Sequence, residues 1–231
     1  MAEIDAVGGW ATVISRVLSG EELDAGTVGV ALEVILEGNA TPAQIAGFVV
    51  ALRSRGETAG ELSAMLDVVI QHAVVVPLTP EQQRSAIDVV GTGGDGSHSI
   101  NVSTMAALVA AGAGALVCKH GNRSASSSCG TADVLEQLGV NIGADAETVA
   151  QCVGSAGIGF CFAPTFHPAF RFAGPPRREI GIPTAFNLLG PMANPGRVQR
   201  QLIGVADPNR AELVLDTLQQ RGAEHVWVVH G

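Results

Sequence analysis

The sequence predicts an α/β protein with a small all-helical domain at its amino terminus. Up to about residue 84, apolar residues recur at helical spacing behind helix-capping residues, and there is little strand signal. From residue 85 onward, short apolar runs that end in glycine turns alternate with longer helical stretches, which is typical of a mostly parallel sheet flanked by helices. We therefore expect a helical domain over residues 1–84 and an α/β domain over residues 85–231.

Capping residues mark the helix starts of the first domain. Thr41 and Gln44 stand on either side of Pro42, which is the pattern of an N-cap threonine, a proline in the first turn and a reciprocal glutamine cap. Thr58 and Glu61 repeat this capping box. Apolar residues at helical spacing follow both starts: Ile45, Phe48, Val49 and Leu52, then Leu62, Met65, Leu66 and Val69.

The second domain alternates strands with helices. Strands are expected at 87–90, 115–118, 159–162, 201–205 and 225–229. Helices are expected at 102–111, 132–138 and 211–221. Because ligand-binding loops follow the carboxyl ends of strands in such sheets, the segments after residues 90 and 118 are the first candidates for a site.

Charge and cysteine patterns exclude several classes of protein. The formal net charge of −9 and the lack of a broad basic face argue against a general nucleic-acid or acidic-membrane binder. No acid occurs between Gly96 and Ala132, so a small anion could be held there. The four cysteines form no CxxC pair, so we expect neither a zinc site nor a disulfide framework. The amino terminus lacks a secretion-signal pattern, which makes the cytoplasm the expected location.

A glycine-rich loop follows the first predicted strand. Gly91-Thr-Gly-Gly-Asp-Gly96 satisfies the GxGxxG pattern, but a nicotinamide site also needs an acid about twenty residues further on. Here the second strand leads into Lys119 and His120 instead. A phosphorylated ligand other than NAD therefore fits better, and a tight turn that uses glycine at positive φ is the structural alternative.

Other polar groups suit an anion, each with a structural alternative. Asn101 to Thr104 open a helix, whose first N–H groups attract anions, or Ser103 is a plain helix cap. Lys119 and Arg123 could bind phosphate oxygens, or Lys119 is a surface lysine. Residues 124–128 form either a phosphate-holding loop or a flexible linker.

A later polar segment lies among prolines and phenylalanines. His167-Pro168 and Arg177-Arg178 could line an aromatic-walled pocket for an aromatic carboxylate, or they could form a solvated basic turn. The spacing alone does not choose between these interpretations.

Together these blocks resemble anthranilate phosphoribosyltransferase, a family of tryptophan synthesis that joins anthranilate to phosphoribosyl pyrophosphate. The matching blocks run in the family's order along essentially the whole chain: Gly91–Gly96, Asn101–Thr104, Lys119–Ser124, Gly130–Glu136, Phe162–Pro164, His167–Pro168, Arg177–Gly181, Phe186–Pro191 and Asn194–Pro195. The resemblance implies a fold of the nucleoside phosphorylase and phosphoribosyltransferase type, in which the helical domain usually forms a homodimer.

The resemblance also implies site residues and a cofactor. For phosphoribosyl pyrophosphate it implies Gly91, Gly94, Asp95, Ser99, Asn101, Val102, Ser103, Thr104, Lys119, His120, Gly121, Asn122, Arg123, Ser124, Ala125, Ser126, Ser127 and Thr131. For anthranilate it implies Gly91, His120, Asn122, His167 and Arg177. Ser103 matches the hydroxyl that helps to hold Mg²⁺, and no residue is expected to act as an acid, base or nucleophile.

The implied reaction gives N-(5-phosphoribosyl)anthranilate and pyrophosphate, with catalysis expected from substrate positioning and stabilisation of the departing diphosphate. The family's domain continues beyond the last strand found here, with an Asp-Glu pair for a second Mg²⁺, so we expect an amino-terminal portion. One alternative is an inactive or ligand-binding fragment. The other, a pyrimidine nucleoside phosphorylase, is disfavoured by the sequence Lys119-His-Gly-Asn122.

Overall fold

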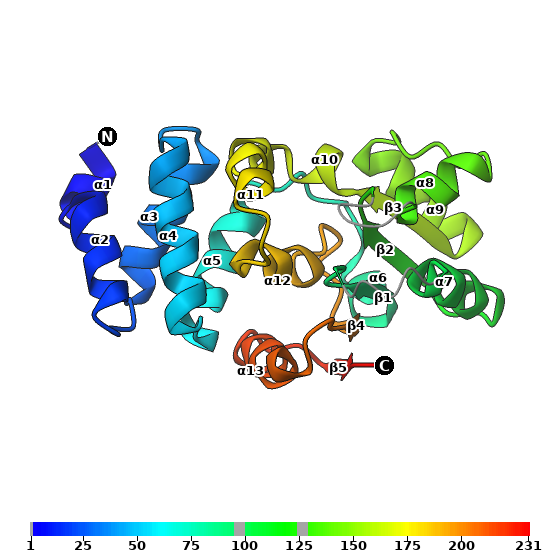
Figure 1. Cartoon of the computed structure of the whole chain (residues 1–231). Helices are drawn as coiled ribbons and strands as arrows, with labels where there is room; N and C mark the ends of the chain where they lie inside the picture. Colours follow the sequence, from blue (N-terminus) through cyan, green and yellow to red (C-terminus); the bar gives the residue numbers. More distant parts are fainter. Residues whose placement is uncertain (1, 95–99, 124–128) are drawn as a thin grey trace. The chain divides into compact units, whose positions relative to one another are not determined.

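The computed structural model describes residues 2–94, 100–123 and 129–231 (Figure 1). Its contacts divide the chain into a helical unit, Met1–Ala73 with His167–Leu189, and a sheet unit, Val74–Phe166 with Gly190–Gly231. The fold class predicted from the sequence is confirmed, because helices dominate the first unit and a parallel sheet the second. The division differs from a single boundary at residue 84, because helix α11 packs on α4 within the helical unit.

Five helices begin the helical unit. They are α1 (Ala2–Ala6), α2 (Gly9–Leu18), α3 (Ala25–Leu36), α4 (Pro42–Arg55) and α5 (Ala59–Gln71). The later segment adds a 3₁₀ turn, η1 (Pro168–Phe172), with α11 (Gly174–Ile180) and the first part of α12 (Ala185–Met192). Both predicted capping boxes are confirmed, since the side chains of Thr41 and Thr58 accept hydrogen bonds from the backbone N–H groups of Gln44 and Glu61.

Apolar side chains fill the centre of the helical unit. Helix α3 packs on α5 and α2 packs on α4. Leu32, Phe48 and Met65 are fully buried, and Trp10 meets Phe48 edge to face, with 5.8 Å between the ring centroids. Burial of these side chains, each of which stabilises the fold by about 1.5–3 kcal/mol, explains why the helical spacing is so regular.

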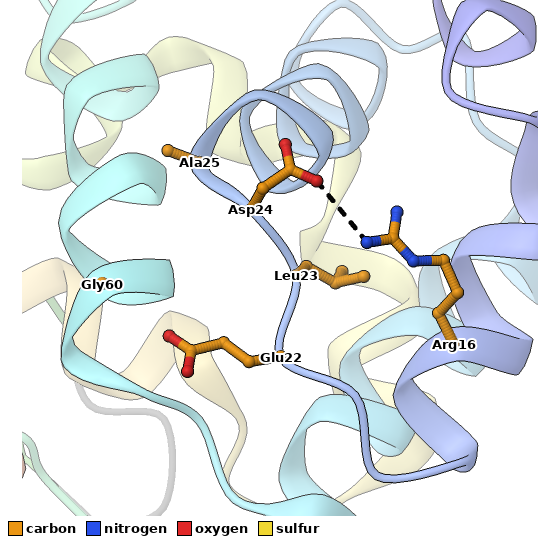
Figure 2. A pocket seen from close by; sticks show the side chains of 6 residues that line it. All are labelled: Arg16, Glu22, Leu23, Asp24, Ala25 and Gly60. Atoms are coloured by element: carbon orange, nitrogen blue, oxygen red, sulfur yellow. Dashed lines mark ion pairs between the residues drawn. The ribbon is translucent and has the colours of Figure 1, made fainter.

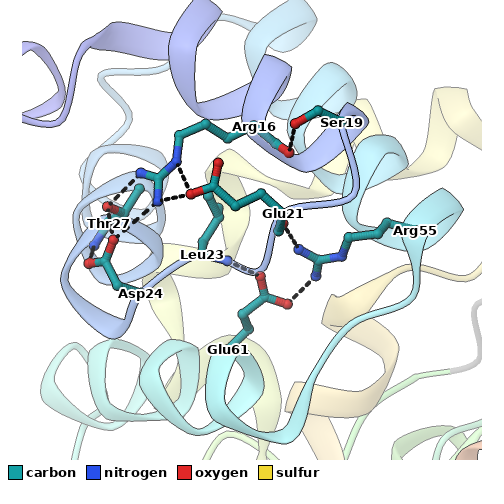
Figure 3. Close-up of polar contacts among 8 residues, drawn as sticks. All are labelled: Arg16, Ser19, Glu21, Leu23, Asp24, Thr27, Arg55 and Glu61. Atoms are coloured by element: carbon teal, nitrogen blue, oxygen red, sulfur yellow. Dashed lines mark hydrogen bonds and ion pairs between the residues drawn. The ribbon is translucent and has the colours of Figure 1, made fainter.

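A buried carboxylate joins the loop after α2 to the start of α5 (Figure 3). The Glu61 side chain forms an ion pair with Arg55 and accepts hydrogen bonds from the backbone N–H groups of Leu23 and Thr58. Nearby, Arg16 pairs with Glu21 at 2.6 Å. These contacts fix the loop before α3 within the helical unit.

Sheet and helices alternate along the second unit. The strands are β1 (Ile87–Gly91), β2 (Val117–Gly121), β3 (Ile158–Phe162), β4 (Arg200–Gly204) and β5 (His225–Val229). The helices are α6 (Pro80–Ser85), α7 (Val102–Gly112), α8 (Thr131–Gln137), α9 (Ala146–Ala156), α10 (Ala163–Phe166) and α13 (Ala211–Gln220), with a 3₁₀ turn η2 (Pro208–Arg210). None of the helices among these described residues is long and apolar enough to cross a membrane.

The five strands form one parallel sheet in the order β3-β2-β1-β4-β5 (Figure 1). Strand β1 pairs with β2 on one side and with β4 on the other, so the chain direction across the sheet reverses at β1. In open α/β sheets such a reversal point, at the carboxyl ends of the strands, is where ligands bind. The loops after β1 and β2 are therefore the candidate location for a site.

The two faces of the sheet carry different side chains. Val89 and Val117 pack under α7, and because side chains alternate along a strand, Lys119 shares their face. Cys118 lies on the opposite face with Val149 and Val153 of α9. Strand β2 ends three residues later than predicted, because its pairing with β3 continues to Gly121. Lys119 therefore lies inside the strand rather than beyond it.

Candidate functional site

The turn after β1 has the backbone geometry that requires glycine. Gly93 and Gly94 have φ angles of +66° and +78°, in the region that other residues rarely adopt. The backbone N–H of Thr92 donates to the carbonyl of Gly204 on β4, at 2.9 Å. Gly91 and Gly94 are exposed, so ligand can approach this backbone closely.

Lys119 is buried, which rules out the surface-lysine interpretation. Lys119 is only 2% exposed. Its Nζ donates one hydrogen bond to the carbonyl of Val89 and another to Oγ of Ser103, 3.3 Å away. Burial lowers the pKa of Lys119, and the negative charge of Asp88 partly opposes that shift. The ammonium thus points from β2 toward the first turn of α7, where an anion is also favoured by the helix dipole.

Asp88 is a buried acid on strand β1. Burial raises its pKa to about 6, while the charge of Lys119 and hydrogen bonds from Asn194 and the His120 backbone oppose the rise. Sequence reasoning did not assign Asp88 or Asn194 to the site. An aspartate within an apolar strand was a usable signal for Asp88. Asn194 stands in a block that matches the family, but nothing in the sequence indicated its contact with Asp88, 106 positions away.

The start of α7 carries the expected hydroxyl groups. Asn101 occupies the N-cap position without a side-chain cap, and its amide instead donates to the Cys129 carbonyl at 3.3 Å. Ser103 lies inside the helix and is therefore not the cap. Thr104 is buried, and its hydroxyl lies 3.3 Å from that of Thr131 at the start of α8. Val102 is exposed beside them.

The residues after Lys119 lead from the sheet to α8. His120 is buried and its backbone N–H donates to Asp88, whereas Asn122 is exposed. A side chain at Gly121 would approach Phe160 and Thr131 to 3.0 Å, so the end of β2 is tightly packed. The strand end is thus fixed where the predicted binding loop begins.

Arg123 is engaged by acids in the structure. Its guanidinium lies 2.6 Å from Asp133 and 2.9 Å from Glu136, both on α8, and these partners, Glu136 first, raise the pKa of Arg123. The side chain is 45% exposed. A phosphate at Arg123 would have to compete with two carboxylates, a relation that the sequence pattern did not indicate.

Six predicted residues lie outside the described part of the chain: Asp95, Ser99, Ser124, Ala125, Ser126 and Ser127. Two others, His167 and Arg177, belong to the helical unit. There the His167 ring stacks on Phe170, with 5.5 Å between centroids, and the Arg177 guanidinium lies 5.0 Å from the centre of the Phe186 ring. Burial lowers the pKa of Arg177. An aromatic group with one guanidinium is therefore present in that unit.

The described residues do not make a metal site on their own. Among them, no three His, Cys, Asp or Glu side chains gather closely enough to bind a metal ion. Because the Ser103 hydroxyl lies 3.3 Å from the Lys119 ammonium, a cation there would be repelled unless anionic oxygens came with it. These residues fit a Mg²⁺ that arrives with phosphate oxygens, which is how Mg²⁺ is usually held beside phosphorylated substrates.

A separate hollow of about 380 Å³ lies in the helical unit (Figure 2). Arg16, Leu23 and Gly60 line it together with the acids Glu22 and Asp24. Arg16 and Asp24 form an ion pair of 3.5 Å across it, so its one cation is already paired. The hollow contains none of the residues predicted for substrate binding.

Comparisons with known proteins agree with this geometry. Residues 83–231 match the model "Glycosyl transferase family, a/b domain", and residues 11–73 match "Glycosyl transferase family, helical bundle domain". The anthranilate phosphoribosyltransferase of Salinispora arenicola is 52% identical over 213 residues, which are 92% of this chain and 60% of the relative. The predicted resemblance to that family is thereby confirmed. The chain spans about three fifths of the length of such relatives.

Solved structures give the same result. The crystal structure of anthranilate phosphoribosyltransferase from Thermus thermophilus matches with a TM-score of 0.88 and 41% identity, covering 95% of this chain and 65% of that one. The Saccharomyces cerevisiae enzyme in complex with PRPP and Mg has a TM-score of 0.83 and 30% identity, covering 94% and 64%. From its helical bundle, its parallel sheet and these matches, the chain belongs to this glycosyl transferase family.

Proposed function

We propose that this chain forms part of an enzyme that transfers the 5-phosphoribosyl group from phosphoribosyl pyrophosphate to the amine of anthranilate. The observation that carries the proposal is the buried ammonium of Lys119, which points at Ser103 beside a glycine turn at the reversal point of the sheet. The 52% identity to a named anthranilate phosphoribosyltransferase supports the choice of substrates.

The diphosphate would be bound by the sheet unit. Backbone groups of Gly91 and Gly94, the first turn of α7 and the side chain of Lys119 supply the anion-binding groups, because each offers N–H donors or positive charge. Asp95, Ser99, His120, Gly121, Asn122, Ser124 to Ser127 and Thr131 complete this proposed set. Arg123 would join it by exchanging one of its carboxylate partners for a phosphate.

Five residues are proposed for anthranilate binding. Asn122 and His120 follow Lys119 on β2, and Gly91 ends β1. Arg177 and His167 would add a guanidinium and a ring for a planar aromatic carboxylate, because arginine binds carboxylates and stacks well on aromatic groups.

The reaction forms a bond from the anthranilate nitrogen to the anomeric carbon and breaks the bond from that carbon to the diphosphate oxygen. Pyrophosphate leaves with the electron pair of the broken bond, and the nitrogen gives its extra proton to water. Lys119 and the first turn of α7 would stabilise the negative charge that develops on the leaving group. The Ser103 hydroxyl would help to hold a Mg²⁺ that comes with the diphosphate, and such an ion would supply further positive charge there.

We further propose that the protein acts in the cytoplasm as a homodimer. The helical domain, residues 1–84, would form the dimer contact, and residues 85–231 would bind phosphoribosyl pyrophosphate. Because the chain spans only about three fifths of its relatives, substrate binding without turnover is the alternative for residues 1–231.

The deciding experiment is the loss of anthranilate fluorescence when phosphoribosyl pyrophosphate and Mg²⁺ are added to the purified protein. Loss that requires phosphoribosyl pyrophosphate establishes the transfer, and omission of that substrate is the control. Calorimetry with phosphoribosyl pyrophosphate separates the alternatives, since binding without fluorescence loss indicates a ligand-binding portion. A folded sample that neither reacts nor binds would contradict the proposal.

A further inference from the structure

A buried polar cluster joins three segments of the sheet unit. Asp88 on β1 accepts hydrogen bonds from the backbone N–H of His120, at 3.1 Å, and from the Asn194 amide, at 2.8 Å. The same amide nitrogen donates to the carbonyl of Cys118 at 2.8 Å, while the amide oxygen of Asn194 accepts from the N–H of Gly196 at 2.8 Å. We name this set of contacts the Asp88–Asn194 clamp.

In the clamp, each polar side-chain atom of Asp88 and Asn194 acts either as a donor or as an acceptor. Asn194 uses both amide hydrogens as donors, and the N–H of Gly196 requires the amide oxygen to face it. Position 88 therefore meets a donor on each side and must present two acceptors, which an aspartate carboxylate does. An asparagine at position 88 would place an N–H against one of these donors.

Fold stability alone does not explain the clamp. Asp88 is fully buried, and burial of a charge costs more than burial of an apolar group of similar size. The charge of Lys119, on the other face of the sheet, acts on Asp88. On the face of Asp88, the pKa of the Cys161 thiol is raised first by its hydrogen bond with Cys118, then by burial, and to a smaller extent by Asp88. Such a network is best explained by the geometry that it enforces.

The clamp holds the residues on both sides of Lys119. Its contacts reach the carbonyl of Cys118 and the N–H of His120, while Lys119 itself points to the other face of the sheet and reaches Ser103. The loop that carries Asn194 lies close against β2, because a side chain at Gly196 would meet the Cys118 sulfur at 2.7 Å. The backbone of Lys119 is thus fixed from its buried side.

We infer that Asp88 and Asn194 are positioning residues for the phosphoribosyl pyrophosphate site, which act by holding the backbone around Lys119 rather than by touching the ligand. The inference rests on the proposed function. It predicts that ligand affinity depends on the match of donors and acceptors between positions 88 and 194, and that this dependence is separate from overall stability.

The test uses three variants: Asp88→Asn, Asn194→Asp and the double exchange. Each single change sets donor against donor or carboxylate against carboxylate. The double exchange restores one donor–acceptor contact between the two side chains, but it sets a carboxylate oxygen against the Cys118 carbonyl, so only part of the loss should be recovered. Gln201→Leu is the matched control, because Gln201 is a buried polar residue paired with Asp88 across β1 and β4, and its side chain donates to the Pro191 carbonyl, away from β2.

Calorimetric titration with phosphoribosyl pyrophosphate and Mg²⁺ is run at a temperature at which circular dichroism shows every variant folded. Both single variants should bind at least about tenfold more weakly, a difference of one order in Kd, and the double variant should recover part of the loss. The Gln201→Leu variant should lose thermal stability but keep its affinity.

Two outcomes overturn the inference, and they are distinguishable. If the unmodified protein does not bind phosphoribosyl pyrophosphate, the proposed function fails and the inference fails with it. If the unmodified protein binds and the folded single variants bind equally well, or the Gln201→Leu control weakens binding as much, the clamp is structural only and the inference alone is wrong.

Discussion

At the scale of single residues, burial shifts the pKa values of Lys119 and Asp88 in opposite directions. Lys119 is the only lysine in the chain, and it lies inside a strand under α7. Its ammonium has a hydroxyl and a carbonyl as partners, and Asp88 supplies the opposing charge. A ligand anion at Ser103 would therefore meet a positive group that is already in place.

Replacement of Lys119 by methionine should weaken binding of phosphoribosyl pyrophosphate by about 10- to 100-fold. A charge-assisted hydrogen bond contributes about 1.5–3 kcal/mol, and methionine keeps the length of the side chain without its charge. Calorimetric titration measures the change. Arg221→Met, which removes a cation at the end of α13 near the amino end of β5, is the control and should leave the affinity unchanged. Equal affinities for Lys119→Met and the unmodified protein would remove Lys119 from the site.

The buried carboxyl of Asp88 should make stability depend on pH. Because its pKa of about 6 in the folded protein lies above the ordinary value of 3.8, the folded state binds the proton more tightly than the unfolded chain. Its contribution is fully present below pH 3.8 and is lost as the pH rises to about 6. The loss amounts to about 3 kcal/mol, from about two pKa units at 1.36 kcal/mol each.

The measurement is the difference in free energy of unfolding between the unmodified protein and Asp88→Asn, determined by urea titration from about pH 4 to about pH 7. The other carboxylates titrate in both proteins, so their effects cancel in the difference. We expect the difference to shift against the unmodified protein as the pH rises. A difference that stays constant over this range would show that Asp88 does not titrate there.

At the scale of elements, close packing fixes where helices lie on the sheet. A side chain added at Gly159 on β3 would meet the Val149 carbonyl and the Val153 side chain of α9 at 2.8 Å. Helix α9 therefore lies as near to β3 as a glycine allows. It was not predicted from the sequence, although Asp145 caps it and Val149 and Val153 recur at helical spacing.

The change Gly159→Ala should lower the free energy of unfolding by about 1–3 kcal/mol, the usual cost of forcing an extra carbon into a packed core. Gly112→Ala at the end of α7 is the control, because nothing lies within 4 Å of its added carbon. Urea titration of both variants measures the effect. A Gly159→Ala protein as stable as the control would show that α9 can move away from the sheet at little cost.

At the scale of the whole molecule, α7 and β5 are among the elements of the sheet unit that expose apolar side chains. On α7 these include Val102, Met105 and Val109, and on β5 they include Trp227, which is 61% exposed, and Val229. Exposed apolar patches of this kind promote association. The net charge of −9 opposes it by repulsion.

Residues 1–231 should therefore self-associate more strongly as salt screens the charge. Sedimentation at rising salt measures this, and Val109→Ser should reduce the association because Val109 is 71% exposed. Gln219→Ser on α13 is the control, because it changes an exposed polar residue without altering the net charge. If Val109→Ser leaves the association unchanged, the α7 surface is not its cause.

The sequence by itself determined the fold class, the capped helices and the glycine turn after β1. Each of these depends on contacts between residues a few positions apart, such as Thr41 with Gln44, so their spacing is visible in the chain. Motif order was enough to indicate the family, although the roles of the individual site residues stay predictions.

The tertiary structure alone decided what those residues meet. It joined Asn194 to Asp88 across 106 positions, paired Arg123 with two acids and brought residues 167–189 into the helical unit. It also placed Lys119 within β2 rather than after it. Such contacts arise when helices and strands pack together, and packing depends on the shapes of whole elements rather than on local spacing.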